Sequence, residues 1–261
     1  MTELTDSDLT AAAAHNRTAV EFHLQGRLKE ARREYGVVLA LDPPRDPSPE
    51  ERLRVEQHAP LLYTTPSEPL PLMDVVAVVH PERPLIGYHL FWEDDIDFPD
   101  DDEPCDHEEV WVAFEPGTPA VSRVCCWYHS RLLDSAGAVR AANRRGGRPA
   151  VYVQWGKHGS LLDGWGDMRA AGLDLMDDMR RTYERLRTEG RRCADFPPAR
   201  HWPVRFTGTW DDFIDFSCRV DPLDWLRRRE RVIVSRWANA VINQHFLLVN
   251  FHPKWEWPRE S

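Results

Sequence analysis

Residues 85–114 read LIGYHLFW, then EDDIDFPDDDEPCDHEE, then VWVAF, which is an acidic segment between two apolar runs. The apolar runs, 85–92 and 110–114, have the length and composition of buried β-strands. The segment between them holds eleven carboxylates and one histidine in seventeen positions. Because like charges about 4 Å apart repel by roughly 1 kcal/mol even in water, such a segment needs solvent or a counter-ion. The sequence therefore predicts two core strands joined by a loop that is suited to a cation.

Further runs of the same kind predict a domain built on sheets. Short apolar or alternating runs bounded by proline, glycine or charge are expected to be strands at 75–79, 85–92, 110–114, 120–128 and 150–155. Their spacing is typical of an antiparallel sandwich. Helical periodicity returns over 167–188 and from 231 to about 244. The expected fold class is α+β, an antiparallel β-sandwich core with an N-terminal helical hairpin and additional C-terminal helices.

The first 58 residues are expected to be helical. Apolar side chains at three- and four-residue spacing predict helices over 6–25 and 28–41, with Gly26 between them and Asp42-Pro43-Pro44 ending the second. Residues 49–58 form a third, short expected helix. The predicted domains are a helical hairpin plus short helix over 1–58, a proline-rich connection over 59–71, and a β-sandwich domain with helical insertions and a C-terminal helix over 72–261.

Composition narrows the classes of function. Lysine and arginine total 33 against 43 acidic residues, a net charge of −10, which argues against a nucleic-acid binder because such proteins concentrate cations against phosphates. No run approaches the roughly 18 apolar residues of a membrane span. The five cysteines are odd in number without a Cys-x-x-Cys pair, and the N-terminus is acidic. We therefore expect a cytoplasmic protein of bacterial type with reduced thiols.

Four histidines stand at or near the ends of the expected strands, namely His89, His107, His129 and His158. Strand ends at one edge of a sandwich converge, so such groups can meet there. Asp106 and Glu108 lie two apart on an extended chain and share a face, which favours chelation, whereas the run 100–102 is typical of solvated charge. Iron, zinc or copper is expected if histidines dominate the site, and calcium or magnesium if carboxylates dominate.

The C-terminal segment supplies a second set of polar candidates. Arg236, Asn239, Asn243, Gln244 and His245 recur every three to four residues, on one face of the expected helix. That face could line the same pocket, with Arg236 binding a carboxylate and His245 beside it, or it could be solvated. Arg236 and His245 are therefore the candidates for binding a substrate or cofactor.

The two long N-terminal helices resemble one tetratricopeptide repeat. The resemblance lies in Ala19, Phe22, Gln25-Gly26, Leu28, Glu30-Ala31, Tyr35, Leu39 and Leu41-Asp42-Pro43. Solenoid repeats generally need at least three neighbours to bury their faces, and one copy is present here. The hairpin is therefore expected to pack on the following domain, and a free peptide-binding groove is the alternative.

The sheet region resembles the β-sandwich core of the necrosis-inducing protein family and of a vacuolar-sorting-related domain family. The corresponding stretches, in order, are 88–92, 94–103, 106–108, 126–129 and 149–158. The resemblance implies a divalent cation held by Asp95 or Asp97 together with Asp106 and Glu108, and a histidine, His129, beside it. His107 stands at the tryptophan of the family signature.

Two functions follow. The first is a divalent-metal-dependent enzyme of small-molecule metabolism, hydrolytic or oxidative, with His129, His158 and His107 as catalytic groups. Its metal ligands are drawn from Asp106, Glu108, His107, His129, His158 and Asp95. The second is a non-catalytic binding or scaffold protein with a structural cation, whose helical hairpin binds a protein partner. Neither reading involves nucleic acid or a membrane span.

Overall fold

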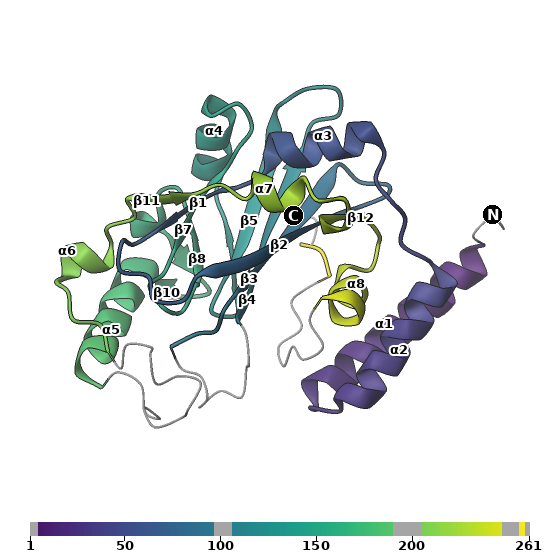
Figure 1. Ribbon diagram of the computed structural model, residues 1–261, viewed down its shortest axis with the longest axis horizontal. Helices are drawn as coiled ribbons and strands as arrows, with labels where there is room; N and C mark the ends of the chain where they lie inside the picture. The colour runs from purple at the N-terminus through teal and green to yellow at the C-terminus, as the bar shows by residue number, and fades with distance from the viewer. Residues whose placement is uncertain (1–4, 97–105, 190–204, 247–255, 259–261) are drawn as a thin grey trace.

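A six-stranded sheet forms the centre of the computed structural model, which describes residues 5–96, 106–189, 205–246 and 256–258 (Figure 1). The order of its strands is β12-β2-β3-β4-β5-β6. Their bounds are β2 Leu72–Val79, β3 Leu85–Trp92, β4 Asp106–Phe114, β5 Val121–Tyr128, β6 Arg131–Asp134 and β12 Val232–Val234. The two strands that flank the acidic segment, β3 and β4, are present as predicted, and they are neighbours at the middle of the sheet.

A smaller sheet has the order β11-β1-β7-β8. Its strands are β1 Leu61–Thr64, β7 Ala150–Val153, β8 Ser160–Leu162 and β11 Cys218–Val220. A single hydrophobic cluster contains side chains of both sheets, including Leu62 and Val151 from the smaller sheet and Tyr88 and Val110 from the larger one. The main core of the protein therefore includes one face of each sheet.

The α+β class is confirmed, but the sheets are mixed rather than wholly antiparallel. β12 pairs with β2 in parallel, and so does β1 with β7, while the other pairs within these two sheets are antiparallel. Parallel neighbours need a long crossover, so each such pair joins strands far apart in the chain. Local sequence patterns therefore do not predict these pairings.

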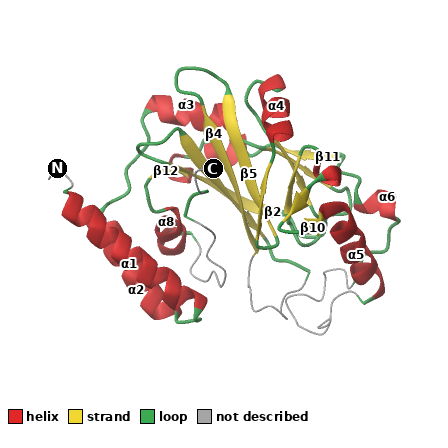
Figure 2. Cartoon of the chain, turned by 180° about the vertical axis from the view of Figure 1, so that it is seen from behind, coloured by secondary structure: helices red, strands yellow, loops and turns green. Residues whose placement is uncertain are grey.

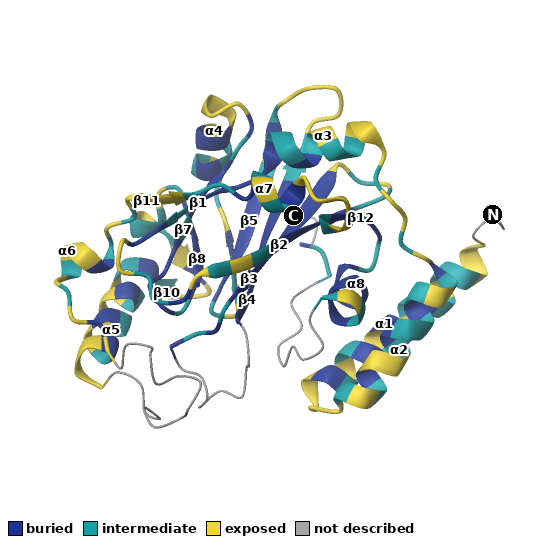
Figure 3. Ribbon diagram, viewed as in Figure 1, coloured by how far each residue is buried: buried dark blue, intermediate teal, exposed yellow. Residues whose placement is uncertain are grey.

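The outer face of the six-stranded sheet carries the C-terminal helix α8 (Ala238–His245). Val76, Val78 and Phe91 of the sheet pack against Val241 and Ile242 of this helix. The central strand β3 is buried along its whole length and β4 along most of it, as Figure 3 shows, because both faces of the sheet are covered by apolar side chains. Strand alternation then decides which side chains of β3 and β4 face the main core and which face the outer side.

The N-terminal hairpin packs on α8, as expected (Figures 1 and 2). It consists of α1 (Asp6–Leu24) and α2 (Leu28–Leu41), and Thr5 caps α1 with a reciprocal capping box to Asp8. Ala19 and Tyr35 share a buried cluster with Ala240 of α8. The third expected helix is α3 (Pro49–His58), capped by Ser48.

Three segments differ from the expectation. The connection 59–71 contains β1, which is an inner strand of the smaller sheet. The segment 167–188 becomes helical only at α5 (Leu175–Thr188), after a 3-10 turn η1 (Trp165–Asp167) and the short pair β9 (Arg169–Ala170) and β10 (Leu173–Asp174). The tail from 231 begins as β12, because the β-branched run 232–234 pairs beside β2 and overrides helical spacing.

The remaining helices are α4 (Ala136–Arg144), α6 (Trp210–Phe213), α7 (Leu223–Leu226) and the 3-10 turn η3 (Arg229–Arg231). Among the described residues, no helix combines the length and apolar character that crossing a bilayer requires.

Candidate functional site

A buried imidazole in the β7–β8 loop is the centre of the site. His158 is fully buried, with its Nδ1 2.7 Å from Asp106 Oδ2 and its Nε2 3.2 Å from Glu68 Oε1. Its ring stacks on Trp92 at 4.3 Å with an interplanar angle of 1°. The strand end at Asp106, the loop before β2 and the β7–β8 loop therefore meet at one side chain.

His158 is an imidazolium at neutral pH. Burial alone would lower its pKa, but the charges of Glu68 and Asp106 and their hydrogen bonds outweigh it and raise the pKa to about 10. Each ring N–H donates to a carboxylate, so neither nitrogen offers a lone pair to a metal. The sequence-predicted role of His158 as a ligand is not supported by this geometry, which gives it the role of an internal cation.

Glu68 is a site residue that the sequence reading missed. Its Oε2 accepts a hydrogen bond from the backbone N–H of Gly156 at 3.0 Å, and its Oε1 accepts one from that of Leu70 at 3.2 Å. The carboxylate thus binds both the His158 ring and the loop that carries it. Glu68 is a single acid in a proline-rich stretch, and no pattern in the sequence sets it apart.

His129 occupies the tight turn between β5 and β6. It and Ser130 have φ of 45° and 65°, so both lie in the left-handed region, as in a type I′ turn, where Asn-Gly is the usual pair. The His129 Nε2 lies 2.5 Å from Gln154 Oε1, and because an amide oxygen only accepts, Nε2 is the donor. Gln154 is oriented in turn by its Nε2, which donates to the sulfur of Met179 at 3.2 Å.

The pKa of His129 moves in the opposite direction to that of His158. Burial lowers it to about 4, and the positive charge of Lys157 adds to this, against opposing contributions from Gln154, Asp178 and Asp106. His129 is therefore neutral at physiological pH, with a lone pair on Nδ1. The two imidazoles of the site differ in protonation state because one faces carboxylates and the other faces an amide and a lysine.

A glycine lets the β7–β8 loop pass close to His129. A Cβ at Gly159 would lie 2.9 Å from His129 Nε2 and 3.1 Å from Gln154 Oε1. His158, the residue before this glycine, also has a left-handed backbone with φ of 51°. Non-glycine residues in this region cost about 1–3 kcal/mol each and occur preferentially at functional sites.

The three predicted ligands on β4, Asp106, His107 and Glu108, are divided between the two faces of the sheet. Asp106 and Glu108 are 7% and 5% exposed, and they share the face of Val110, as predicted. His107 lies on the opposite face, where its Nε2 is 3.1 Å from His89 Nδ1. It is separated from Asp106 and Glu108 by the backbone of the strand, and so it cannot join them around one ion.

The histidine pair on the outer face has a buried acid beside it. His89 Nε2 lies 3.4 Å from Glu109 Oε1, and the His107 ring stacks between those of His89 and Phe91. Burial lowers the pKa of His89 to about 3, which keeps it neutral. The two histidines are thus hydrogen-bonded to each other on the outer face, away from Asp106 and Glu108.

The other predicted ligands and binders lie in different settings. Asp95 forms an ion pair with Lys157 at 3.4 Å, next to the His158 loop, whereas Asp97 and the run 100–103 lie outside the described residues. Arg236 binds Asp42 and Glu82, and His245 is exposed at the end of α8, so both lie on the outer side of the sheet. Within the described ranges, no three or more His, Cys, Asp or Glu side chains are arranged to hold a metal ion.

Comparison with known proteins gives no relative. No protein-family model, curated protein or solved structure matches the chain. The resemblances to the necrosis-inducing and tetratricopeptide families therefore remain predictions from the sequence.

Proposed function

We propose that the protein is a divalent-cation-dependent hydrolase of small molecules, with its reaction centre where β4, the β5–β6 turn and the β7–β8 loop meet. The observation that carries the proposal is the position of Asp106. Its carboxylate lies within 2.7 Å of a charged imidazole, His158, and close enough to a neutral one, His129, to influence its pKa. Acids and bases whose environments drive their pKa values apart are typical of catalytic sites.

The proposed cation is a hard metal ion, magnesium or calcium. His158 uses both ring nitrogens for carboxylates and His107 faces the outer side, so the donors on the inner face of β4 are the oxygens of Asp106 and Glu108. The sequence places further carboxylates directly before them, at 100–103. Oxygen donors favour magnesium or calcium over iron, zinc or copper. A cation held there would polarise a substrate oxygen or acidify a water molecule.

His129 is the proposed proton acceptor. Gln154 fixes its tautomer by accepting from Nε2, which leaves the Nδ1 lone pair for a proton taken from water. The low pKa keeps this lone pair available throughout the neutral range. His158 acts differently, since its charge and two hydrogen bonds hold Asp106 and Glu68 in place.

The cation is tested with protein purified without chelator. We expect bound magnesium or calcium by elemental analysis, and a melting temperature that rises by about 5–10 °C at a cation concentration a hundredfold above the dissociation constant. Asp106→Asn and Glu108→Gln should abolish the rise. Asp134→Asn is the control, because Asp134 is an exposed carboxylate on the same sheet, paired with Arg123. Absence of bound cation and of any rise in the wild type would refute the proposal.

The hydrolytic step is tested separately on a panel of nitrophenyl esters and phosphate esters. In His129→Asn the new asparagine tolerates the left-handed backbone, so the turn should keep its conformation. We expect kcat to fall by about 10²–10⁴-fold while the cation-dependent rise in melting temperature is kept. Turnover that survives this substitution would remove His129 from the mechanism.

The contacts of the hairpin argue against the free peptide-binding groove. Its buried face is covered by α8, and Gln244 Nε2 donates to the backbone oxygen of Arg32 at 2.6 Å. At its base, Asp42 accepts from Trp237 Nε1 at 2.9 Å and from Arg236 at 3.1 Å. A hairpin held in this way supports the domain rather than offering a free groove.

A further inference from the structure

A cleft of about 270 Å³ lies beside the site and is not used by the mechanism above. Its walls include Ser67, Trp155, Arg205, Phe206, Gly208 and Asp215. The volume is close to the lower end of the range for ligand pockets, about 300–1,000 Å³, so the cleft suits a small metabolite rather than a polymer.

The floor of the cleft is aromatic and rigid. Trp155 and Phe206 are only 2% and 3% exposed, and their rings meet edge to face at 4.9 Å. Trp155 Nε1 donates to the backbone oxygen of Ser67 at 2.8 Å, which ties the floor to the wall. Phe206 packs in turn on Phe213 at 5.1 Å. Only a small part of each ring reaches the cleft, where it gives the floor a fixed apolar lining.

One wall depends on a glycine. A Cβ at Gly208 would lie 2.8 Å from the Phe206 ring and 2.9 Å from the Cβ of Asp212. The close approach of the backbone at this point fixes the wall against the aromatic floor. Gly208 therefore lets this irregular segment pass close to the Phe206 ring.

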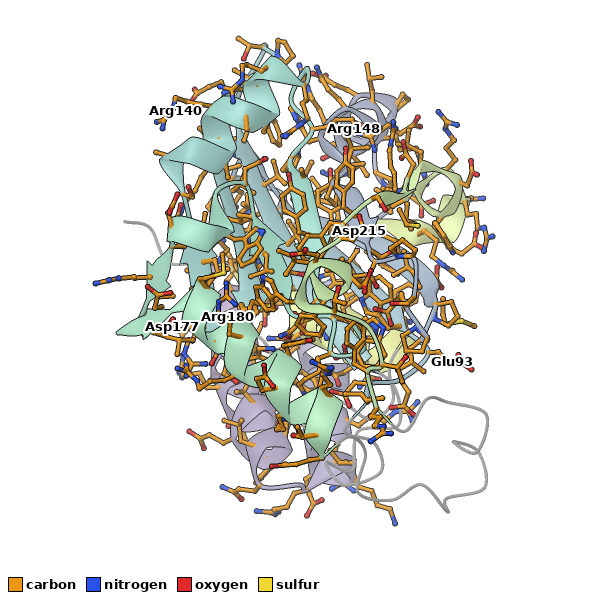
Figure 4. The ribbon with its side chains drawn as sticks, turned by 90° about the vertical axis from the view of Figure 1, so that its left-hand side faces the viewer. Glu93, Arg140, Arg148, Asp177, Arg180 and Asp215 are labelled. Carbon is orange, nitrogen blue, oxygen red and sulfur yellow. The ribbon has the colours of Figure 1, made fainter. Side chains whose placement is uncertain are left out.

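The rim of the cleft carries one cation and one anion. Arg205 and Asp215 are exposed, and neither has an ion-pair partner among the residues that the structure describes. Asp212 differs, because its carboxylate accepts from Thr209 N and Oγ1, both at 2.7 Å. In Figure 4, Asp215 lies on the face turned to the viewer, between Arg148 above and Arg180 below.

We propose that this cleft binds a small zwitterion with an apolar side chain, such as an aromatic α-amino acid. Asp215 binds its ammonium group, Arg205 its carboxylate, and the Trp155–Phe206 floor its side chain. Because the cleft offers one charge-assisted hydrogen bond to an ammonium and one to a carboxylate, a ligand with both groups binds more tightly than a ligand with only one of them.

The cleft and the proposed reaction centre share a wall. Ser67 precedes Glu68, and Trp155 stands between Gln154, the partner of His129, and Gly156, the partner of Glu68. The cleft and the His129–His158 pair are therefore joined through the short segments 67–68 and 154–156. The inference deepens the proposed function by naming its substrate class and rests on it for the reaction, whereas the experiment below measures binding alone.

Titration calorimetry on the full chain with three probes tests the proposal. L-phenylalanine carries both charges, phenethylamine only the ammonium, and 3-phenylpropionate only the carboxylate. Asp215→Asn should weaken phenylalanine and phenethylamine by about ten- to a hundredfold and leave phenylpropionate unchanged. Arg205→Gln should weaken phenylalanine and phenylpropionate by a similar factor and leave phenethylamine unchanged.

The matched controls are Asp211→Asn and Arg228→Gln, two exposed charges outside the cleft. Both should bind all three probes as the wild type does. Circular dichroism confirms that each variant is folded. Failure of the wild type to bind phenylalanine, or equal losses in the control variants, would overturn the inference and would leave the cation test unaffected.

Discussion

Deprotonation of His158 should destabilise the fold between pH 7 and pH 9. Its pKa is about 10 in the folded chain, against about 6.5 when unfolded, so the folded state binds the extra proton between these values. The stabilisation is complete below about pH 6.5 and is lost as the pH rises through 10. It amounts to about 5 kcal/mol in full, and about 3 kcal/mol of it disappears between pH 7 and pH 9.

The assay is urea denaturation followed by tryptophan fluorescence at pH 7, 8 and 9. EDTA is present throughout, so that no divalent cation competes with His158 for Asp106 and Glu68. The comparison is with His158→Asn, which accepts the left-handed backbone but carries no charge. At pH 7 this variant should lose about 3–5 kcal/mol, because it leaves two buried carboxylates without their cation.

The difference between the two proteins isolates His158. Burial raises the pKa of Cys125 to about 12 and that of Cys126 well above its usual value. Both thiols therefore also contribute less to the free energy of unfolding as the pH rises through 9. That loss is common to the wild type and His158→Asn. The free-energy gap between them should therefore shrink by about 3 kcal/mol from pH 7 to pH 9. A gap that stays constant would refute the charged state of His158.

Three further results are expected. Burial lowers the pKa of His89 to about 3 and that of His129 to about 4, so the unfolded chain binds more protons than the folded chain below pH 6.5. The melting temperature should therefore fall as the pH drops from 6.5 to 4, and a constant melting temperature would contradict the neutral state of these histidines. Gly159→Ala should cost about 1–3 kcal/mol in urea denaturation, because its Cβ meets the His129 ring. Gly36→Ala in α2, whose added Cβ would lie 4.0 Å from its nearest neighbour, Gln244 of α8, should be neutral or stabilise by up to about 1 kcal/mol, and equal effects of the two substitutions would contradict the close packing. Ser130→Gly should raise the urea midpoint by the equivalent of about 1 kcal/mol, because glycine has no penalty at φ of 65°, and a lower midpoint would show that the turn is not strained.

The sequence predicts those parts of the fold that are set by local pattern. The runs around the acidic segment become β3 and β4, and the third expected helix, 49–58, is α3. β12 and β1 escape prediction because their parallel partners lie far away in the chain. Pairings of that kind are decided by the packed core, and short strands such as these carry little signal of their own.

The strand alternation that places Asp106 and Glu108 on one face also separates them from His107. A period of two places Asp106 and Glu108 on one face and necessarily sends His107 to the other, so the triplet could never act as one ligand set on a regular strand. Glu68 was beyond reach for a different reason. Its importance comes from His158 and Gly156, about ninety residues later, and only the folded chain brings them together.

Backbone strain distinguishes the two histidines of the site. His129, Ser130, His158 and Ala171 are the non-glycine residues with positive φ among the described positions, and the first three belong to one site. His158 is compensated by two charge-assisted hydrogen bonds and a stacked tryptophan, so stability alone can account for it. His129 has one neutral hydrogen bond, worth about 1 kcal/mol, against a strain of about 1–3 kcal/mol. Asparagine or glycine would suit the backbone of that turn better, so the strain at His129 agrees with the catalytic role that we propose for it.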